Sequence, residues 1–191
     1  MSFRVEEKLL IDRKQILEFK NFLFKKKAQE VFPARKIKSL YFENFKEEMY
    51  SDSLEGIVPR KKIRVRNYPD KKDLTLYLEI KISSAEGRYK VRNLIDKDKF
   101  NNLKKIGLYD NQYGACRPLV YVIYDREYYQ IGDVRISIDE NIEYFLFSGR
   151  ELGQDNNSVV ELKTNINKNR DDLLNNFPFQ RTRFSKYCNA F

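Results

Sequence analysis

Charged and apolar residues alternate over three consecutive segments between Pro59 and Ile95, and this pattern constrains the fold more than any other feature. Residues two apart in an extended strand point to the same face. The pattern therefore predicts three strands, each with a polar and an apolar face. The residues on the polar faces are Lys62, Arg64, Arg66, Thr75, Tyr77, Glu79, Lys81, Ser83, Arg88, Lys90 and Arg92. One such strand is typical of a solvated sheet face, but three mainly basic ones repel each other and favour a bound anion.

The composition narrows the functional classes. The 191 residues carry a formal net charge of +9, which favours an acidic partner, and they include no histidine. The lack of histidine excludes Ser-His and Cys-His nucleophile systems and His-ligated zinc. The two cysteines, Cys116 and Cys188, are interpreted as ordinary thiols, which suits a reducing cytoplasm. We expect no membrane segment, because no apolar run approaches a membrane span, and a single domain over residues 1–191.

Five further segments have the pattern of strands, and two have the pattern of helices. The strands are expected at residues 3–11, 37–43, 119–130, 134–141 and 159–163. An apolar stripe predicts a helix from its N-cap, Asp12, towards Pro33. A second helix is expected from Asp96 towards Lys105, stopped by Gly107. We interpret as irregular the segments 44–58, 109–118 and 147–157.

Eight strands are enough to close a barrel, and closure removes exposed sheet edges. We therefore expect an α+β, mainly β fold: an eight-stranded antiparallel β-barrel tunnel with the helices packed outside. If the charged faces point inward, one cavity is lined by Arg4, Lys8, Lys62, Arg64, Arg66, Lys81, Lys90, Arg92, Arg126, Arg135 and Lys163, with Glu6, Glu79, Asp139 and Glu161 among them. So many charges cannot be buried unpaired, so the cavity must be wet and must hold an anion.

The order of the charged motifs carries a family resemblance. The motifs are Arg4-Val5-Glu6-Glu7-Lys8, Ser39-Leu40-Tyr41-Phe42, Arg64-Val65-Arg66-Asn67-Tyr68, Glu79-Ile80-Lys81, Lys90-Val91-Arg92, Tyr124-Asp125-Arg126, Val134-Arg135-Ile136-Ser137-Ile138-Asp139, Val160-Glu161-Leu162-Lys163 and Phe184-Ser185-Lys186-Tyr187. With this ordered set the sequence resembles the triphosphate tunnel metalloenzymes and, within them, the catalytic domain of the vacuolar transporter chaperone (VTC) family of polyphosphate polymerases. The resemblance covers nearly the whole chain and implies an eight-stranded antiparallel tunnel.

The resemblance also implies an enzymatic function: metal-dependent transfer of the terminal phosphoryl group of ATP to a growing polyphosphate chain. The basic residues that look like the catalytic set, which holds the triphosphate or polyphosphate, are Lys8, Arg64, Arg66, Lys81, Arg126 and Lys186. Further phosphate or nucleotide contacts are implied for Arg4, Lys62, Lys90, Arg92, Tyr124, Arg135, Lys163 and Ser185. Glu161 looks like the ligand of a divalent metal, Mg²⁺ or Mn²⁺, with Glu6 and Glu79 as the next candidates. Phosphoryl transfer needs charge neutralisation and alignment more than proton transfer, which suits these residue types.

The sequence departs from the family pattern in two ways. Most tunnel metalloenzymes begin with alternating Glu, Glu and Lys, whereas the first of these positions is Arg4 here, which favours the VTC branch. Eukaryotic VTC proteins also carry an accessory regulatory domain and membrane helices that are absent from this sequence. We therefore expect a cytoplasmic activity that is not by itself coupled to translocation.

The same residues are compatible with two other functions. A triphosphatase acting on inorganic triphosphate or nucleotides needs the same phosphate grip, and so does a non-catalytic polyphosphate-binding module. A nucleic-acid partner is not expected, because the aromatic residues of the best strands lie mostly opposite the basic face. Single residues also have structural interpretations: Glu79 and Lys81 as a cross-strand ion pair, Asp139 as a turn residue at a strand end, Ser185-Lys186 as a solubilising tail, and Tyr128 and Tyr129 as core.

Overall fold

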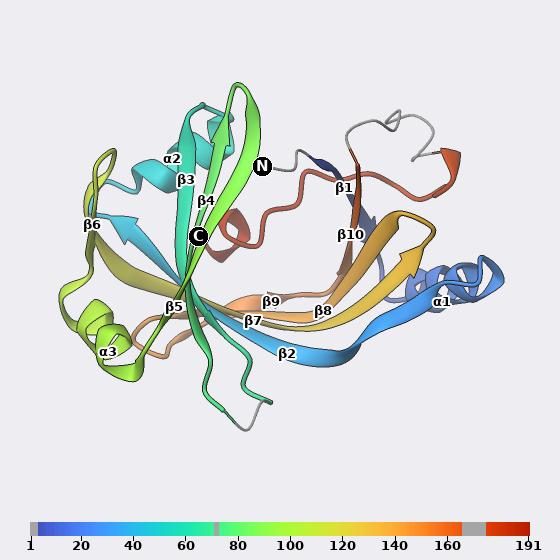
Figure 1. Ribbon diagram of the computed structural model, residues 1–191, viewed down its shortest axis with the longest axis horizontal. Coiled ribbons are helices and arrows are strands. Elements are labelled where there is room, and N and C mark those ends of the chain that lie inside the picture. The colour runs from blue at the N-terminus through green and yellow to red at the C-terminus, as the bar shows by residue number, and fades with distance from the viewer. Residues whose placement is uncertain (1–3, 71–72, 166–174) are drawn as a thin grey trace. The chain divides into compact units, whose positions relative to one another are not determined.

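The computed structural model describes residues 4–70, 73–165 and 175–191, which form a ten-stranded sheet with helices beside it (Figure 1). The strands are β1 (Arg4–Ile11), β2 (Gln29–Asn44), β3 (Arg60–Asn67), β4 (Leu76–Ser84), β5 (Gly87–Ile95), β6 (Leu108–Asp110), β7 (Gly114–Ile131), β8 (Val134–Leu146), β9 (Glu151–Asp155) and β10 (Ser158–Asn165). The helices are α1 (Gln15–Lys25), α2 (Glu48–Glu55), α3 (Lys97–Ile106) and the 3₁₀-helix η1 (Cys188–Ala190).

The strands pair in the order β1-β10-β8-β7-β2-β3-β4-β5, with β6 beside β7 and β9 beside β8. The eight strands of the main path are the eight that the sequence predicts, so the mainly β, antiparallel fold is confirmed. The expected closure is different in one respect: the pairing of the described residues leaves β1 and β5 as the two ends of the path. These two strands belong to different compact units of the chain.

Contacts divide the chain into two compact units. Unit one comprises Met1–Arg35, Tyr124–Ile142 and Gln154–Phe184. Unit two comprises Lys36–Ile123, Glu143–Gly153 and Ser185–Phe191. The long strands β2, β7 and β8 each contribute to both units, so neither unit is a continuous stretch of sequence. A single domain over residues 1–191 stays a prediction.

In unit one, β1, β10 and β8 form an antiparallel ladder with one polar and one apolar face. The register places Lys8 opposite Glu161, and Glu161 opposite Ser137, on the polar face. The apolar face forms a buried core with α1 and Phe177; its members are Leu9, Ile11, Phe19, Leu23, Val134, Ile136, Ile138, Val160, Leu162 and Phe177. The helix therefore packs on the apolar side of the charged strands, as the alternation predicts.

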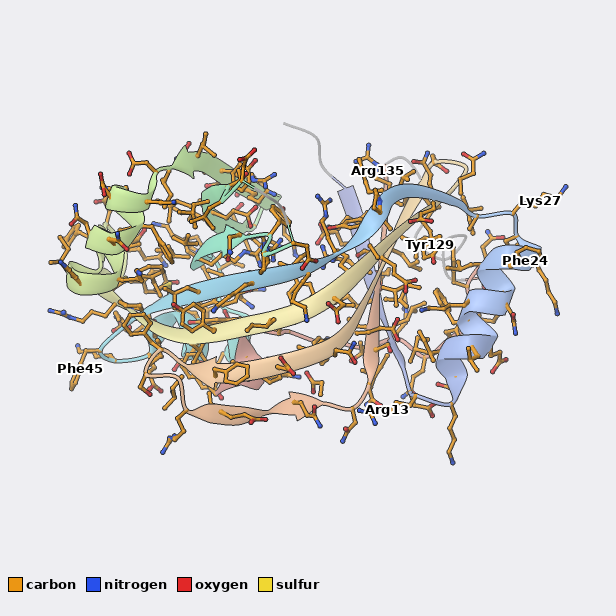
Figure 2. All side chains as sticks on the ribbon, turned by 90° about the horizontal axis from the view of Figure 1, so that it is seen from below. Arg13, Phe24, Lys27, Phe45, Tyr129 and Arg135 are labelled. Atoms are coloured by element: carbon orange, nitrogen blue, oxygen red, sulfur yellow. The ribbon has the colours of Figure 1, made fainter. Side chains whose placement is uncertain are left out.

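Helix α1 begins near the expected N-cap but ends early. Asp12 Oδ1 accepts hydrogen bonds from the backbone N–H groups of Lys14 (2.8 Å) and Gln15 (2.7 Å), which starts the helix. The helix ends at Lys25, so the prediction of helix towards Pro33 is wrong. The chain is already extended in β2 from Gln29, because Val and Phe in this stretch suit a strand as well as a helical stripe. Phe24, on the exposed side of α1, remains in solvent (Figure 2).

In unit two, β3, β4 and β5 form a meander (Figure 1), and the register aligns their basic residues on one polar face. The register places Arg64 opposite Glu79, and Glu79 opposite Arg92. The opposite face buries Ile63 and Val65 of β3. Residues aligned across the three strands thus form a row on the polar face. The next row on the same face lies two residues further along each strand.

Helix α3 has the ends that the sequence predicts. Asp96 Oδ1 accepts a hydrogen bond from the backbone N–H of Lys99 (2.7 Å) at its start. Gly107 follows the last residue with φ 80°, and a Cβ there would lie 2.1 Å from the carbonyl oxygen of Cys116. Glycine is therefore required both by the backbone angle and by the close approach of β7.

The segments expected to be irregular contain short elements. Residues 44–58 hold α2, and Asn44 Oδ1 accepts a hydrogen bond from the backbone N–H of Glu48 (2.9 Å), the first residue of this helix. Residues 109–118 hold most of β6 and the start of β7, and residues 147–157 hold β9. Elements of three to eight residues are too short for a reliable period, which is why the sequence pattern missed them. No helix among the described residues is long and apolar enough to cross a membrane.

Candidate phosphate-binding clusters

Four cationic side chains surround one buried carboxylate, Glu79, on the polar face of β3, β4 and β5. Arg64 donates to Glu79 Oε2 from Nε (2.8 Å) and from Nη2 (2.6 Å). Lys90 Nζ and Arg92 Nε each lie 3.3 Å from Glu79 Oε1, and Arg66 Nη1 lies 3.9 Å from Oε2. We call these five residues the Glu79 cluster. It brings together four of the basic residues that the alternation assigned to one face.

The Glu79 cluster has a buried centre and an edge formed by the exposed residues Lys90 and Arg92, and it carries more positive than negative charge. Glu79 is 1% exposed, and Arg64 and Arg66 are 6% and 7% exposed. Burial by itself would raise the pKa of Glu79, but the charges of Arg64, Arg66 and Lys90 outweigh it and hold that pKa well below its usual range. Burial, with the like charges of Arg92 and Arg64, lowers the pKa of Lys90 in spite of Glu79. The four cations and one carboxylate of the cluster carry a formal net charge of +3, which favours an anion nearby.

Hydroxyl groups of β2 bind the guanidinium groups of the cluster. Arg64 Nη1 donates to the Tyr41 hydroxyl (2.8 Å), and Arg66 Nε donates to Ser39 Oγ (3.1 Å). The register places these two hydroxyl residues directly opposite the arginines they bind. Burial would raise the pKa of Tyr41, but the neighbouring arginines outweigh burial and lower it. The arginines are therefore held in fixed orientations by β2 as well as by Glu79.

A row of lysines lies next to the Glu79 row on the same strands. Lys62, Lys81 and Lys90 are aligned across β3, β4 and β5. Lys62 Nζ donates to Ser185 Oγ (2.9 Å) and lies 5.1 Å from the centre of the Tyr187 ring. Lys81 is exposed. The predicted contacts Lys62 and Ser185 are thus adjacent, although 123 positions separate them.

Glu43 is a buried carboxylate of β2 that the sequence pattern did not single out. It accepts hydrogen bonds from the Tyr187 hydroxyl and from the backbone N–H groups of Met49 (3.2 Å) and Tyr50 (3.0 Å). Burial raises the pKa of Glu43 in spite of these donors. Glu43 therefore anchors Tyr187, and with it the preceding residues 185–186, to β2. The alternation of Glu43 with Tyr41 and Ser39 indicates that it shares their face of β2. The sequence could not indicate its partner Tyr187, which lies 144 positions away.

In unit one, Arg126 forms a two-pronged ion pair with Asp139. Arg126 Nε donates to Asp139 Oδ1 (2.5 Å) and Nη2 donates to Oδ2 (2.6 Å). Burial lowers the pKa of Arg126, but Asp139 and Tyr124 outweigh it and the pKa is raised well above its usual value. Asp139 is 1% exposed and lies inside β8, so its interpretation as a strand-end turn residue is wrong. Tyr124 packs beside the pair, with its ring centre 5.3 Å from Arg126 Cζ.

Two carboxylates of unit one share the ammonium group of Lys163. Lys163 Nζ lies 3.2 Å from Glu161 Oε2 and 3.7 Å from Glu6 Oε1. Glu161 is 8% exposed and lies directly opposite Lys8, whose Nζ donates to the carbonyl oxygen of Phe184 (2.6 Å). The predicted metal ligand, its next candidate and two predicted phosphate contacts thus lie on one polar face.

Three further predicted residues lie outside these clusters: Arg135, Lys186 and Arg4. Arg135 is exposed and lies opposite Lys163 in the ladder (Figure 2). Lys186 is half-buried and follows Ser185. Arg4 lies in β1, but its side chain is outside the described part of the structure. That the basic clusters of the two units line one cavity stays a prediction.

The carboxylates of unit one fit a metal that is bound jointly with substrate. Among the described residues no group of three or more His, Cys, Asp or Glu side chains could hold a metal by itself. Magnesium and similar hard cations need only one or two carboxylates when phosphate oxygens supply further ligands. Glu161 and Glu6 offer such oxygens on one face, next to Lys163. Glu79 fits less well, because four cations already surround its carboxylate.

Several solved structures are similar to this chain over nearly their whole length. A candidate adenylate cyclase from Bacillus halodurans has a TM-score of 0.66 at 10% identity, covering 100% of this chain and 97% of that one. A candidate adenylate cyclase from Vibrio parahaemolyticus has a TM-score of 0.62 at 15% identity, covering 100% and 99%. HpAC1 from Hippeastrum, a candidate adenylyl cyclase described with a dominant triphosphatase activity, has a TM-score of 0.59 at 14% identity, covering 100% and 95%. At these identities the similarity shows the fold, which is that of the triphosphate tunnel proteins.

The family follows from the sequence model rather than from these structures. The model of the VTC domain matches residues 3–191, so the chain belongs to the VTC domain family. No curated protein matches the sequence. The family and the fold together support an enzyme with phosphoryl chemistry on triphosphates, in a class that generally uses divalent metals. The class predicted from the ordered motifs is confirmed.

Proposed function

We propose that this protein is a metal-dependent polyphosphate polymerase, which transfers the terminal phosphoryl group of ATP to a polyphosphate chain in the cytoplasm. The observation that carries the proposal is the Glu79 cluster, in which two arginines less than a tenth exposed share one carboxylate with Lys90 and Arg92. Lys90 and Arg92 add positive charge at the exposed edge of the cluster, with side chains 41% and 35% exposed. So many like charges in one place cost free energy unless an anion offsets them. A chain of phosphates provides that anion in a repeating form.

The basic residues have the geometry to bind phosphates and to neutralise their charge. Arginine forks bind phosphate oxygens with two parallel hydrogen bonds, and lysines supply point charges. The lysine row of β3, β4 and β5 lies beside the arginine row, so successive phosphates can each meet a cation. In unit one, Arg126, Lys8 and Lys163 are the residues we assign to the same task. Neutralised oxygens in fixed positions are what in-line phosphoryl transfer requires.

Glu161, with Glu6 beside it, is the residue we assign to the metal. Either Mg²⁺ or Mn²⁺ would supply charge neutralisation at the oxygens that bridge the reacting phosphates. Glu161 is buried, and the ammonium group of Lys163 contacts both its carboxylate and that of Glu6. In the absence of histidine, these carboxylates provide ligands that match a hard cation.

A product assay separates this function from its two alternatives. Purified protein is incubated with ATP and MnCl₂ or MgCl₂, and the products are resolved by gel electrophoresis and by phosphate release. Polyphosphate that lengthens with time is expected. Free phosphate without polymer would instead establish a triphosphatase, and binding without turnover would establish a polyphosphate-binding module.

Arg66→Ala should weaken the binding of triphosphate directly, without metal. A charge-assisted hydrogen bond contributes about 1.5–3 kcal/mol, so the dissociation constant should rise by about 10- to 140-fold. Isothermal titration with inorganic triphosphate in a chelator measures this, and Arg66→Lys should retain part of the affinity because it keeps the charge but loses the fork. Arg117→Ala, an exposed arginine on β7, is the matched control and should bind as the wild type does. Equal binding by the Arg66→Ala and Arg117→Ala proteins would remove Arg66 from the phosphate grip.

A further inference from the structure

Two tyrosines adjoin the Glu79 cluster on the same face of unit two, and the proposed phosphate grip does not use them. Tyr77 lies opposite Arg66 in β3 and opposite Leu94 in β5, so it occupies the row next to Glu79. Adjacent same-face rows are two residues apart, which is about 6.6 Å along a strand. Tyr68 follows β3 and contacts Tyr77 edge to face, with ring centres 6.3 Å apart and planes at 73°.

Arg92 connects this aromatic pair to the cation cluster. Its Cζ lies 3.6 Å from the centre of the Tyr77 ring, and its Nη2 donates to the Tyr68 hydroxyl (3.1 Å). Its Nε at the same time lies 3.3 Å from Glu79 Oε1. One guanidinium group therefore lies over an aromatic ring at the edge of the basic cluster.

The surface beside this platform is apolar and open. Leu94, in the row of Tyr77, is 70% exposed, and the Arg92 side chain is 35% exposed. Aromatic rings and stacked guanidinium planes are the groups on which proteins stack nucleobases. A purely phosphate ligand gains nothing from such a platform, whereas a nucleotide carries a base one ribose away from its phosphates.

We infer that Tyr77, Tyr68 and Arg92, with Leu94, form the subsite for the base of a nucleoside triphosphate. This inference rests on the proposed function, because it places the base beside the cations assigned to the phosphates. The platform recognises the base by its flat face, so purine triphosphates bind alike and a pyrimidine triphosphate, with a smaller ring, binds less tightly. Tyr77 is thus an exception to the expectation that the aromatic residues of the best strands lie mostly opposite the basic face.

The test compares two ligands on matched variants, without metal. Dissociation constants for ATP and for inorganic triphosphate are measured by isothermal titration in a chelator. Tyr77→Leu should weaken ATP binding by about 5- to 140-fold, which is a stacking contribution of about 1–3 kcal/mol converted at about 1.4 kcal/mol per tenfold. Triphosphate affinity should stay unchanged in the same protein. Tyr77→Phe keeps the ring and should behave as the wild type with both ligands.

Tyr89→Leu is the control, because Tyr89 is a 43% exposed tyrosine on the opposite face of β5. The inference is overturned if Tyr77→Leu leaves ATP binding unchanged, or lowers ATP and triphosphate binding by the same factor, since Tyr77 would then only support Arg92. In the wild type, ATP, GTP and UTP give a readout that needs no variant, and equal affinity for ATP and UTP would also overturn it. Wild-type protein that binds triphosphate but makes no polymer would contradict the proposed polymerase and leave the base subsite standing.

Discussion

Replacing Glu161 with Gln should lower turnover by orders of magnitude and leave metal-free triphosphate binding intact or stronger. The substitution keeps the size of the side chain but removes the charge that a divalent metal needs as a ligand. Without metal, a carboxylate facing the phosphates repels them, so its loss favours binding. Turnover measured against MnCl₂ concentration, together with triphosphate titrations in a chelator, separates these two effects.

Two matched variants make the Glu161 result interpretable. Glu18→Gln removes an exposed carboxylate from α1 and should leave both measurements unchanged. Glu6→Gln removes the other carboxylate that contacts Lys163, and should raise the metal concentration needed for half-maximal turnover. Full metal-dependent turnover in the Glu161→Gln protein would show that Glu161 is a structural partner of Lys163. Loss of metal-free affinity as severe as that of Arg66→Ala would lead to the same conclusion.

The alternation of charged residues predicted the sheet well, because it depends only on the period of a strand. Lys62, Arg64 and Arg66 share a face in the structure, and Glu79 of β4 lies on the same face. The order of the motifs, rather than any one of them, identified the family over residues 3–191. A pattern that repeats along several strands is reinforced by each of them, which is why the fold could be recognised before any contact was known.

The pairing of individual charges could not be predicted from the same pattern. Glu79 had been interpreted as a possible metal ligand or a partner of Lys81, whereas the structure surrounds it with four other cations. Asp139 had no predicted partner, and its ion pair with Arg126 depends on the adjacency of β7 and β8. Same-face periodicity gives the side of a sheet, but neighbours across strands depend on register.

Contacts made by the C-terminal segment were the least predictable. Tyr187 binds Glu43, and Ser185 binds Lys62, across more than a hundred positions of sequence. No local propensity records such contacts, because they form only when the chain returns to an already folded surface. The family motif Phe184-Ser185-Lys186-Tyr187 was the only signal that this segment belongs to the site.

The Glu79 cluster reconciles two demands on the same residues: it must be stable without ligand and still attract an anion. A full set of carboxylates would balance the cations but repel phosphate, and none would leave the buried arginines uncompensated. A single carboxylate that pairs with four cations lies between these extremes. Without ligand, Glu79 thus supplies part of the negative charge that the proposed ligand supplies when it binds.

Glu79→Gln should therefore lower the free energy of unfolding by about 3–5 kcal/mol, because it removes the carboxylate that pairs with the buried Arg64 and Arg66. Urea denaturation with and without triphosphate measures this, and triphosphate should stabilise the variant more than the wild type because the anion replaces the lost carboxylate. Glu86→Gln, a fully exposed carboxylate of the β4–β5 turn, is the control and should unfold as the wild type does.

The pH dependence of the Glu79→Gln effect follows from the lowered pKa of Glu79. A carboxylate whose pKa is lower in the folded than in the unfolded chain stabilises the fold fully above the unfolded value of 4.5, and loses this contribution as the pH falls towards the folded value. The difference in unfolding free energy between wild type and variant should stay constant from about pH 8 to pH 5.5 and shrink below about pH 4.5. A difference that instead grows with acidification, or a variant that is as stable as the wild type and gains nothing extra from triphosphate, would show that Glu79 does not hold the cluster together. The positive charge of the arginines would then be balanced by other groups, and the Glu79 cluster would not be the primary anion site.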